Sequence, residues 1–447
     1  MAVEKHSHPA GRAGYDSIMA DRYPIRPIAA DEYPYFRRVH DHAFNSSPPS
    51  PARWARAVRL FELDRSLAAF DPSLPPGESV VGTTGVYSLR MTVPGANLPV
   101  AGVSAVSVLP SHRRRGVLRS LMHRQLADIA ARGEEPIAAL WASETPIYAR
   151  YGYGRAAANA YFRFERGDGT MAATAPTDPA LSLRLAEPQA VTAELAKAYR
   201  AVLAFQPGFF ARTEDWWARV LQDEPDERHG LSPLRCLLAE DGSGVRGYAL
   251  YATADRWDDA TGLPDCRLAV REVVAADPAA GAALWHSLLS RDLVSTVTAE
   301  LRPAEDPLLY QLLDQRRARV QVSDGIWVRI IDLPGALVKR AYSCPVDVVL
   351  EVTDALLPGN AGRWRLRVSE PAGTGAGDPS TGTRCERTQQ HADLALDVRE
   401  LGAAYLGGTR LGTLAAAGLI TELRPGALNR LSAAMTWDPA PWCPQIF

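Results

Sequence analysis

The sequence predicts a mixed α/β protein built from several domains. A chain of 447 residues is too long for one hydrophobic core, and ordinary domain sizes give two to four domains, of which we expect three. Val-rich segments, an amphipathic helical segment and another apolar strand follow one another, which is the order of a β-α-β unit inside a mixed sheet. Hydrophobic residues make up 47% and charged residues 22% of the chain, so most of it should fold.

The first expected unit alternates helical and extended patterns. Apolar residues recur at three- and four-residue spacing in its helical segments, whereas β-branched residues with partial alternation mark its strands. In chain order the expected elements are helices at 31–44 and 52–63, strands at 78–93 and 98–110, a helix from Val117 to the stop at Gly133, a strand at 136–142 and a tyrosine-rich loop at 147–154.

The second expected unit repeats this logic. Residues 246–254 and 266–276 resemble strands, and residues 278–293 resemble a helix. A shift of 167 positions lays RSLMHRQL of the first unit over HSLLSRDL of the second, which predicts an internal duplication. Under that shift Arg113, Arg114, Arg115 and Gly116, which precede the helix at Val117, fall on Ala280, Gly281, Ala282 and Ala283. The second copy is therefore expected to lack an anion site.

The expected domain limits follow the Pro- and Gly-rich stretches, of which 167–179 is the main boundary. Residues after about 320 have a strand, a helix and further strands at 346–352 and 362–368, and two later helical patterns precede the terminal tail. We therefore expect a flexible leader at 1–20 and domains at 21–166, 180–318 and 319–447.

Charge and cysteine content exclude several classes of protein. The 49 Lys and Arg against 51 Asp and Glu leave a net charge of -2, so nothing global indicates a nucleic-acid partner. The five cysteines are scattered and never form a CxxC pair, and no histidines stand as a ligand pair, so we expect no metal. No signal peptide or membrane span is indicated, and a cytoplasmic protein is expected.

The segment VSAVSVLPSHRRRGVLRSLM carries the main chemical signal. An acyl-CoA has an extended pantetheine arm, which an open strand edge can bind, and a pyrophosphate, which the free amides of a helix N-terminus can bind. Here a strand ends at Pro110, Gly116 allows close approach of phosphate to backbone, and Arg113, Arg114 and Arg115 add charge-assisted donors. Alone, an RRRG run is usually a solvated basic turn, but the flanking strands and helix favour a cofactor site.

The run Arg113 to Leu118 resembles the R/Q-x-x-G-x-G/A signature of GNAT acetyltransferases, with Leu118 in place of the final Gly or Ala. The wider string SVLPSHRRRGVL, together with ASETPIYARYGYG and a C-terminal phenylalanine, is similar to the enhanced-intracellular-survival (Eis) acetyltransferase family. The resemblance covers nearly the whole chain from about residue 22. It implies two GNAT folds in tandem, a sterol-carrier-protein-like C-terminal domain and assembly into homohexamers.

The resemblance also implies residue roles around acetyl-CoA. The expected cofactor-binding residues are Val106, Val108, Arg113, Arg114, Gly116, Val117, Leu118 and Ser143. Tyr148 would be the general acid, although Tyr151 and Tyr153 lie close by, and the free carboxylate of Phe447 would be the general base. A tyrosine hydroxyl can protonate a departing thiolate, and burial in an apolar tail would strengthen a carboxylate as a base.

The acceptor is the least defined partner. The first helix would line its cleft, so Asp41, Phe44 and Trp54 are candidates for holding a cationic amine, with ordinary helix-surface and core roles equally open. We expect direct acetyl transfer in a ternary complex to a primary amine of an aminoglycoside, a lysine-bearing substrate or a related compound. Ile446 stands where some relatives have an acidic residue, which weakens the case for tight binding of polycationic aminoglycosides. A non-enzymatic acyl-CoA sensor or lipid-binding protein and a longer-chain acyltransferase are the alternatives.

Overall fold

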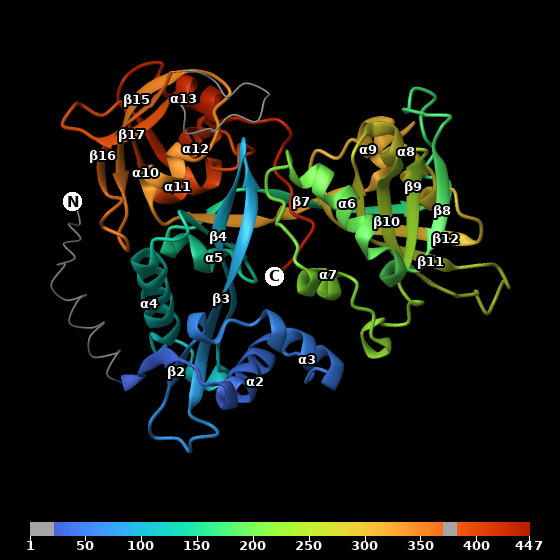
Figure 1. Ribbon diagram of the computed structural model, residues 1–447, viewed down its shortest axis with the longest axis horizontal. Coiled ribbons are helices and arrows are strands. Elements are labelled where there is room, and N and C mark those ends of the chain that lie inside the picture. The colour runs from blue at the N-terminus through green and yellow to red at the C-terminus, as the bar shows by residue number, and fades with distance from the viewer. Residues whose placement is uncertain (1–21, 370–381) are drawn as a thin grey trace, which may run out of the picture.

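The computed structural model describes residues 22–369 and 382–447, so the expected leader at 1–20 lies outside the described residues. The chain forms three sheet-based units, and the C-terminus lies between them near the middle of the molecule (Figure 1). The expected mixed α/β architecture is confirmed.

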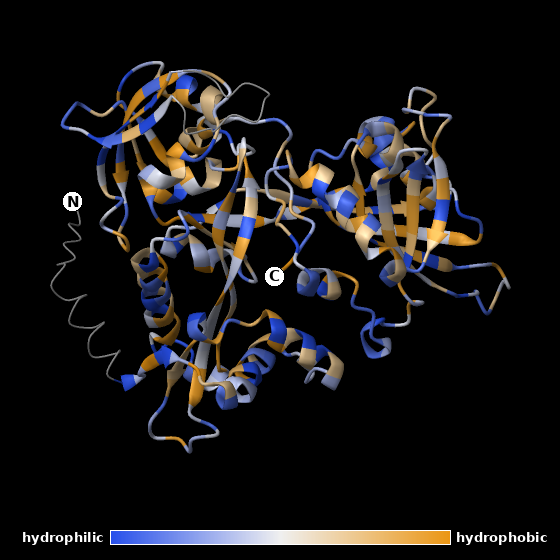
Figure 2. Cartoon of the chain, in the orientation of Figure 1, coloured by the Kyte–Doolittle hydropathy of each residue, from blue (hydrophilic) through white to orange (hydrophobic). Residues whose placement is uncertain are grey.

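The first unit is a 7-stranded sheet of order β1-β2-β3-β4-β5-β14-β6. Its strands are β1 (Ile25–Pro27), β2 (Leu67–Phe70), β3 (Val80–Val93), β4 (Ala96–Val108), β5 (Ile137–Trp141), β6 (Gly154–Arg155) and β14 (Ile326–Ile330), and its helices are α2 (Tyr33–Phe44), α3 (Pro51–Leu60), α4 (Val117–Arg132) and α5 (Thr145–Tyr148). Helix α4 buries Leu121, Met122 and Leu126 against the sheet, and its opposite face is hydrophilic (Figure 2).

The second unit is a 7-stranded sheet of order β13-β7-β12-β11-β10-β9-β8. Its strands are β7 (Ala158–Glu165), β8 (Ser182–Ala186), β9 (Arg235–Asp241), β10 (Gly244–Ala254), β11 (Cys266–Ala275), β12 (Val294–Pro303) and β13 (Gln321–Asp324), and its helices are α6 (Thr192–Leu203), α7 (Glu214–Val220), α8 (Pro278–Leu289) and α9 (Leu308–Gln311). As in the first unit, a helix links two parallel neighbours, here β11 and β12. This repeated connection agrees with an internal duplication, but α4 begins at Val117 and α8 at Pro278, so the two helices correspond at a shift of 161 positions and not at the expected 167. The expected alignment of the basic run with residues 280–283 is therefore wrong, because those residues lie inside α8.

The two sheets exchange strands across the expected domain limits. Strand β7 follows the first unit in sequence but pairs with β12 and β13 of the second sheet. Strand β14 follows the second unit in sequence but pairs with β5 and β6 of the first sheet, and all its residues are buried. Because each sheet contains a strand from beyond its own segment, the expected limits at 166 and 319 do not separate self-contained sheets.

The third unit is a 5-stranded sheet of order β17-β16-β15-β18-β19 covered by helices. Its strands are β15 (Val346–Thr353), β16 (Gly362–Val368), β17 (Thr383–Arg387), β18 (Leu394–Asp397) and β19 (Ile420–Glu422), and its helices are α10 (Leu333–Val338), α11 (Val398–Ala404), α12 (Leu411–Ala416) and α13 (Ala427–Met435). One hydrophobic core runs from β3, β4 and β5 of the first sheet into this unit. Arg329 of β14 adds a buried ion pair with Asp354, at 2.7 Å.

The chain end leaves the third unit and returns to the first by way of the second. The Trp442 backbone amide donates to the Pro207 carbonyl at 2.9 Å, and the Arg212 guanidinium donates to the side chain of Gln445 at 2.8 Å. The Trp141 indole donates to the Gln445 carbonyl at 2.9 Å. These contacts hold the tail in one course, so its last residue reaches the first sheet in a defined position.

No helix in the described part of the chain is long and apolar enough to span a bilayer.

Candidate active site

Strands β4 and β5 diverge where the sequence predicts a cofactor edge. Residues 100–102 of β4 pair in parallel with residues 137–139 of β5. From there to Val108, β4 pairs with β3 and no longer with β5. Ala105 has a φ of 52°, which lies in the left-handed region and bends the strand close to a register shift. The edge of β4 beyond Gly102 that faces β5 can therefore pair with an extended chain such as a pantetheine arm.

The turn after β4 leads into the N-terminus of α4 and fits an anion. Gly116 has a φ of 82°, a conformation that favours glycine, and it directly precedes the helix. The first amides of an α-helix have no intrahelical acceptors and carry the positive end of the dipole. Arg113 and Arg114 are exposed and make no hydrogen bond or ion pair with the described residues, whereas Arg115 donates to the Tyr23 hydroxyl at 3.4 Å. Two guanidinium groups thus stay available for a pyrophosphate.

A second glycine brings α4 close to the sheet. A Cβ at Gly82 of β3 would lie 2.6 Å from Cγ1 of Val117, so a larger residue would push the start of the helix outward. Val117 is buried there, and Leu118 packs beside it as a partly buried residue. Leu118 therefore occupies the Gly or Ala position of the signature with its side chain against the core.

The equivalent turn of the second unit is closed to an anion. Helix α8 begins after Asp277, whose side chain caps the helix by accepting a hydrogen bond from the Ala280 amide at 3.0 Å. The same carboxylate is bound by Arg246 at 2.8 Å. Since a carboxylate occupies the helix N-terminus, a phosphate would be repelled there, and the structure favours a cofactor site in the first unit alone.

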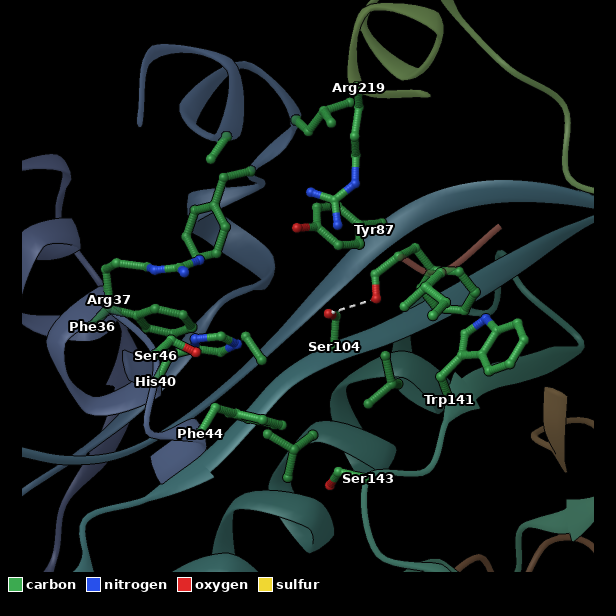
Figure 3. Close-up of a pocket in the computed structure, with 18 of the residues that line it drawn as sticks. Phe36, Arg37, His40, Phe44, Ser46, Tyr87, Ser104, Trp141, Ser143 and Arg219 are labelled. Carbon is green, nitrogen blue, oxygen red and sulfur yellow. Dashed lines mark hydrogen bonds between the residues drawn. The ribbon is translucent and has the colours of Figure 1, made fainter. Parts of the chain in front are cut away.

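A cavity of about 410 Å³ lies between α2, α3, β4, β5 and the C-terminus, and we call it the central cavity (Figure 3). Aromatic rings and arginines make up much of its wall. The lining residues are Tyr33, Phe36, Arg37, His40, Phe44, Ser46, Arg53, Arg56, Ala57, Leu60, Phe61, Tyr87, Val103, Ser104, Ala105, Val106, Trp141, Ala142, Ser143, Tyr148, Arg219, Gln222, Ile446 and Phe447.

The C-terminal carboxylate is held inside this cavity. The Ser104 hydroxyl donates to a Phe447 carboxylate oxygen at 3.0 Å, the dashed line of Figure 3. The Phe447 ring packs edge-on against Phe210 with centroids 5.0 Å apart, and a Cβ at Gly102 would lie 3.2 Å from that ring. Only 6% of Phe447 is exposed, so the chain end is fixed rather than frayed.

Tyr148 and Ser143 line the same cavity from the segment that follows β5. Burial raises the pKa of the Tyr148 hydroxyl to about 12, and its hydrogen bond with the Ser143 side chain acts in the opposite direction. A tyrosine with this pKa stays protonated at neutral and moderately alkaline pH. It can therefore donate a proton but cannot serve as a base under those conditions.

The remaining predicted residues divide into two groups. Val106 and Phe44 line the central cavity, whereas Val108, Asp41 and Trp54 do not. The Asp41 carboxylate accepts a hydrogen bond from Nε of Arg37 at 2.8 Å, and Trp54 packs on Tyr33 with ring centroids 5.0 Å apart. The geometry therefore gives no support to a direct contact of Asp41 or Trp54 with an acceptor.

Sequence reasoning missed Ser104, Tyr87, His40 and the four arginines of the cavity wall, which are Arg37, Arg53, Arg56 and Arg219. Arg37, His40 and Phe44 share one face of α2 through three- and four-residue spacing, so that helical periodicity could have grouped them. His40 has a lowered pKa, mainly because it is desolvated and also because Arg37 is close. Arg219 comes from α7 in the second unit, and no local pattern could have placed it here.

Loss of Arg114 is expected to weaken cofactor binding. We expect Arg114→Gln to raise the Kd for CoA roughly 5- to 10-fold, because one charge-assisted contact in an exposed site is lost. The salt dependence of binding should become shallower in the same variant. Isothermal titration of CoA at two salt concentrations measures both effects. Arg124→Gln is the control, since Arg124 lies on α4 but pairs with Asp128, and equal Kd values for both variants would contradict the assignment.

Comparison with known proteins agrees with this geometry and confirms the expected two GNAT folds followed by a sterol-carrier-protein-like domain. Models of an acetyltransferase (GNAT) domain match residues 24–156 and 208–330, and a sterol carrier protein domain model matches residues 333–444. An uncharacterized N-acetyltransferase of Streptomyces coelicolor is 42% identical over 89% of this chain and 94% of its own. The N-acetyltransferase Eis of Mycobacterium tuberculosis is 36% identical over 81% of this chain and 85% of its own. The crystal structure of Eis1 from Mycobacterium abscessus has a TM-score of 0.76 and 32% identity, covering 95% of this chain and 100% of that one.

Proposed function

We propose, from the premise that this chain belongs to the Eis family of GNAT N-acetyltransferases, that it transfers acetyl directly from acetyl-CoA to a primary amine bound in the central cavity. Membership in the family is given by the similarity over most of both chains, and it implies the use of acetyl-CoA. The acceptor, the direct transfer in a ternary complex and the residue roles below are the proposal.

The observation that carries the proposal is the meeting of Tyr148 and Phe447 in one cavity. The two residues come from the first and the third unit, yet both line the wall that also contains Val106 of the open strand edge. A proton donor and a carboxylate beside a cofactor edge are the groups that amine acetylation needs. The Phe447 role and the cofactor-binding roles of Val106, Ser143 and the α4 turn remain predictions that this arrangement supports.

Acetyl-CoA, when bound, supplies an acetyl thioester at the cavity. One residue of this chain would then accept a proton from the acceptor, and another would donate a proton to the leaving group. The Phe447 carboxylate, oriented by the Ser104 hydroxyl at 3.0 Å, would accept a proton from the ammonium form of the acceptor, directly or through water. Tyr148 would donate its hydroxyl proton to the sulfur as the C–N bond forms and the C–S bond breaks. The second proton that the nitrogen then loses would reprotonate Tyr148, directly or through water. The aromatic rings that line the cavity lower the local polarity around both groups and so strengthen these hydrogen bonds.

Replacing Tyr148 tests its role. We expect Tyr148→Phe to lower kcat about 100-fold, the usual contribution of a general acid. In the wild type a Tyr148 pKa of about 12 keeps the acid protonated, so kcat should stay level between about pH 8 and pH 10. A general acid with an ordinary tyrosine pKa near 10 would instead lose half of its protonated form at about pH 10. Thiol release under saturating substrate measures kcat in both cases.

The control is Tyr153→Phe. The Tyr153 side chain is buried beside Tyr148, but its hydroxyl has no hydrogen-bond partner among the described residues, so removing the hydroxyl should leave kcat within about 2-fold. If Tyr148→Phe and Tyr153→Phe turned over acetyl-CoA equally fast, Tyr148 would not be the acid.

A polycationic aminoglycoside is the acceptor that the cavity supports least. No Asp or Glu appears among the lining residues of the described chain, and four arginines do. A polycation would meet like charges there. A single primary amine, such as a lysine-like side chain or a small molecule, avoids most of this repulsion.

The alternative of a non-enzymatic acyl-CoA sensor or lipid-binding protein would leave the buried Phe447 carboxylate and Tyr148 without a purpose in one cavity. CoA binding with no thiol release from any amine would favour that alternative. A longer-chain acyltransferase would show a preference for longer acyl-CoA donors in the same assay. Assembly into homohexamers and a cytoplasmic location stay predictions, and the solution mass relative to the 48.5 kDa chain tests the former.

A further inference from the structure

The charge of the central cavity is distributed unevenly. Its wall contains the guanidinium groups of Arg37, Arg53, Arg56 and Arg219, and among the described residues that line it the C-terminal carboxylate of Phe447 is the one anion. The carboxylates that balance three of these arginines stand outside the lining set. They are Asp41, which binds Arg37 at 2.8 Å, Glu227, which binds Arg53 at 2.9 Å, and Glu224, which binds Arg56 at 2.8 Å.

Arg219 is the arginine that no carboxylate balances among the described residues. Its guanidinium carbon lies 5.6 Å from the centroid of the Trp216 ring. In Figure 3 its side chain descends from α7 toward the Tyr87 ring, and the Arg37 side chain extends from α2 into the same cavity. Both charges act on the Tyr87 hydroxyl, whose pKa is raised by desolvation and lowered in part by Arg219 and Arg37.

The cationic wall continues beyond the central cavity. An adjoining cavity of about 310 Å³ shares Arg53, Arg219 and Ile446 with it and adds Arg271. Arg271 donates a hydrogen bond to the backbone carbonyl of Gln222 at 2.8 Å. Both acids of that wall form ion pairs, Glu227 with Arg53 and Glu272 with Arg212. An anionic group at the junction of the two cavities would meet guanidinium donors on several sides.

Aromatic rings form much of the rest of the central wall. Tyr33, Phe36, Phe44, Phe61 and Trp141 all line it, so a flat or apolar molecular body would be well covered. A guanidinium group presents a planar fork of donors that matches a carboxylate or phosphate. The cavity thus combines an apolar wall, the Phe447 carboxylate bound by Ser104, and arginines at its rim.

We propose that the preferred acceptor is a zwitterionic amine with an apolar or aromatic body and one oxyanion, carboxylate or phosphate, which Arg219 binds together with Arg37. This inference rests on the proposed acetyl transfer to an amine and names the class of that amine. The amino group lies toward the Phe447 carboxylate, and the oxyanion lies toward the arginines. The arginines of the wall therefore select against polycationic acceptors.

Matched amines test the proposal on the intact protein. The probes are para-(aminomethyl)benzoate, its neutral carboxamide, the phosphonate of the same shape, and neamine as a polycation. We expect kcat/KM for the benzoate or the phosphonate to exceed that for the carboxamide roughly 10- to 100-fold, because charge-assisted hydrogen bonds are gained. Whichever of the two anions is faster identifies the oxyanion. A carboxamide or neamine that is turned over as fast as both anions would overturn the proposal.

Arg219→Gln should remove most of the advantage of the anionic amines through KM, while the carboxamide rate changes less than about 3-fold. Arg219→Lys should restore part of it, since the charge returns without the planar fork. Arg59→Gln is the control, because Arg59 is an exposed residue of α3 that does not line the cavity. An equal loss of rate for the benzoate and the carboxamide in Arg219→Gln would indicate a structural role and contradict the inference.

The two levels of the proposal fail differently. Absence of thiol release with every probe would refute the proposed acetyl transfer. In that case, titration of the benzoate and the carboxamide into the CoA complex still measures anion selectivity, and equal affinities would refute the inference as well.

Discussion

Converting the Phe447 carboxylate to a carboxamide is expected to lower kcat by about 100-fold or more, while the Kd for CoA stays unchanged. The carboxamide keeps the ring that packs on Phe210 and keeps an oxygen that can accept the Ser104 hydrogen bond. It removes only the negative charge and the basic site. A general base contributes about 100- to 10,000-fold to a rate, so its loss should lower kcat at least as much as the loss of the Tyr148 hydroxyl.

Ligation of an amidated C-terminal peptide gives this protein, and thiol release together with CoA titration gives the two constants. Phe447→Leu is the matched control, because it changes the ring and retains the carboxylate, and it should keep most of the activity. A short extension after Phe447 moves the carboxylate out of the cavity and should behave like the carboxamide. More than half of the wild-type kcat in the amidated protein would exclude the carboxylate as the base.

Separating residues 22–166 from the rest of the chain is expected to give a polypeptide without a cooperative unfolding transition. That fragment lacks β14, whose residues are all buried between β5 and β6. Fully burying a large apolar side chain contributes roughly 1.5–3 kcal/mol, so Ile326, Trp327, Val328 and Ile330 together represent roughly 6–12 kcal/mol. A domain's whole stability is about 5–15 kcal/mol, and the fragment would lose most of it.

Thermal denaturation followed by near-ultraviolet circular dichroism tests this expectation. Fusing residues 320–334 to the fragment through a Gly/Ser linker returns β14 and should restore part of the transition. The control is the same fusion with Val328→Lys, which places a charge at a fully buried position. A sharp transition in the fragment without β14 would mean that the first sheet does not depend on the exchanged strand.

The cofactor end of the site was accessible to sequence analysis because its parts are local. A strand, a glycine turn and an amphipathic helix follow one another within a short segment, and each has a signature that depends only on backbone preference and periodicity. Gly116 at a φ of 82° before Val117 agrees with the predicted turn. The position of Tyr148 after β5 is equally local, and the structure places it on the cavity wall.

The acceptor end was only partly accessible. The sequence pointed to helix 31–44, and Phe44 of that helix lines the cavity. It also suggested Asp41 as an anionic contact, but Arg37 lies one helical turn earlier and takes up that carboxylate at 2.8 Å. Which of two neighbouring charges faces a cavity depends on the packing around the helix, and neither composition nor spacing reveals it.

By itself, the sequence determined that this protein has three α/β units, and it predicted a single turn for a pyrophosphate and a tyrosine and a terminal carboxylate as candidate proton carriers. These features depend on local propensity or on family resemblance. Only the tertiary structure decided that β7 and β14 change sheets, that Ser104 holds the chain end, and that Arg219 of the second unit charges the cavity of the first. The physical reason is that such contacts join residues far apart in the chain. They form because buried strands and charges must find partners, a requirement that local sequence patterns do not encode.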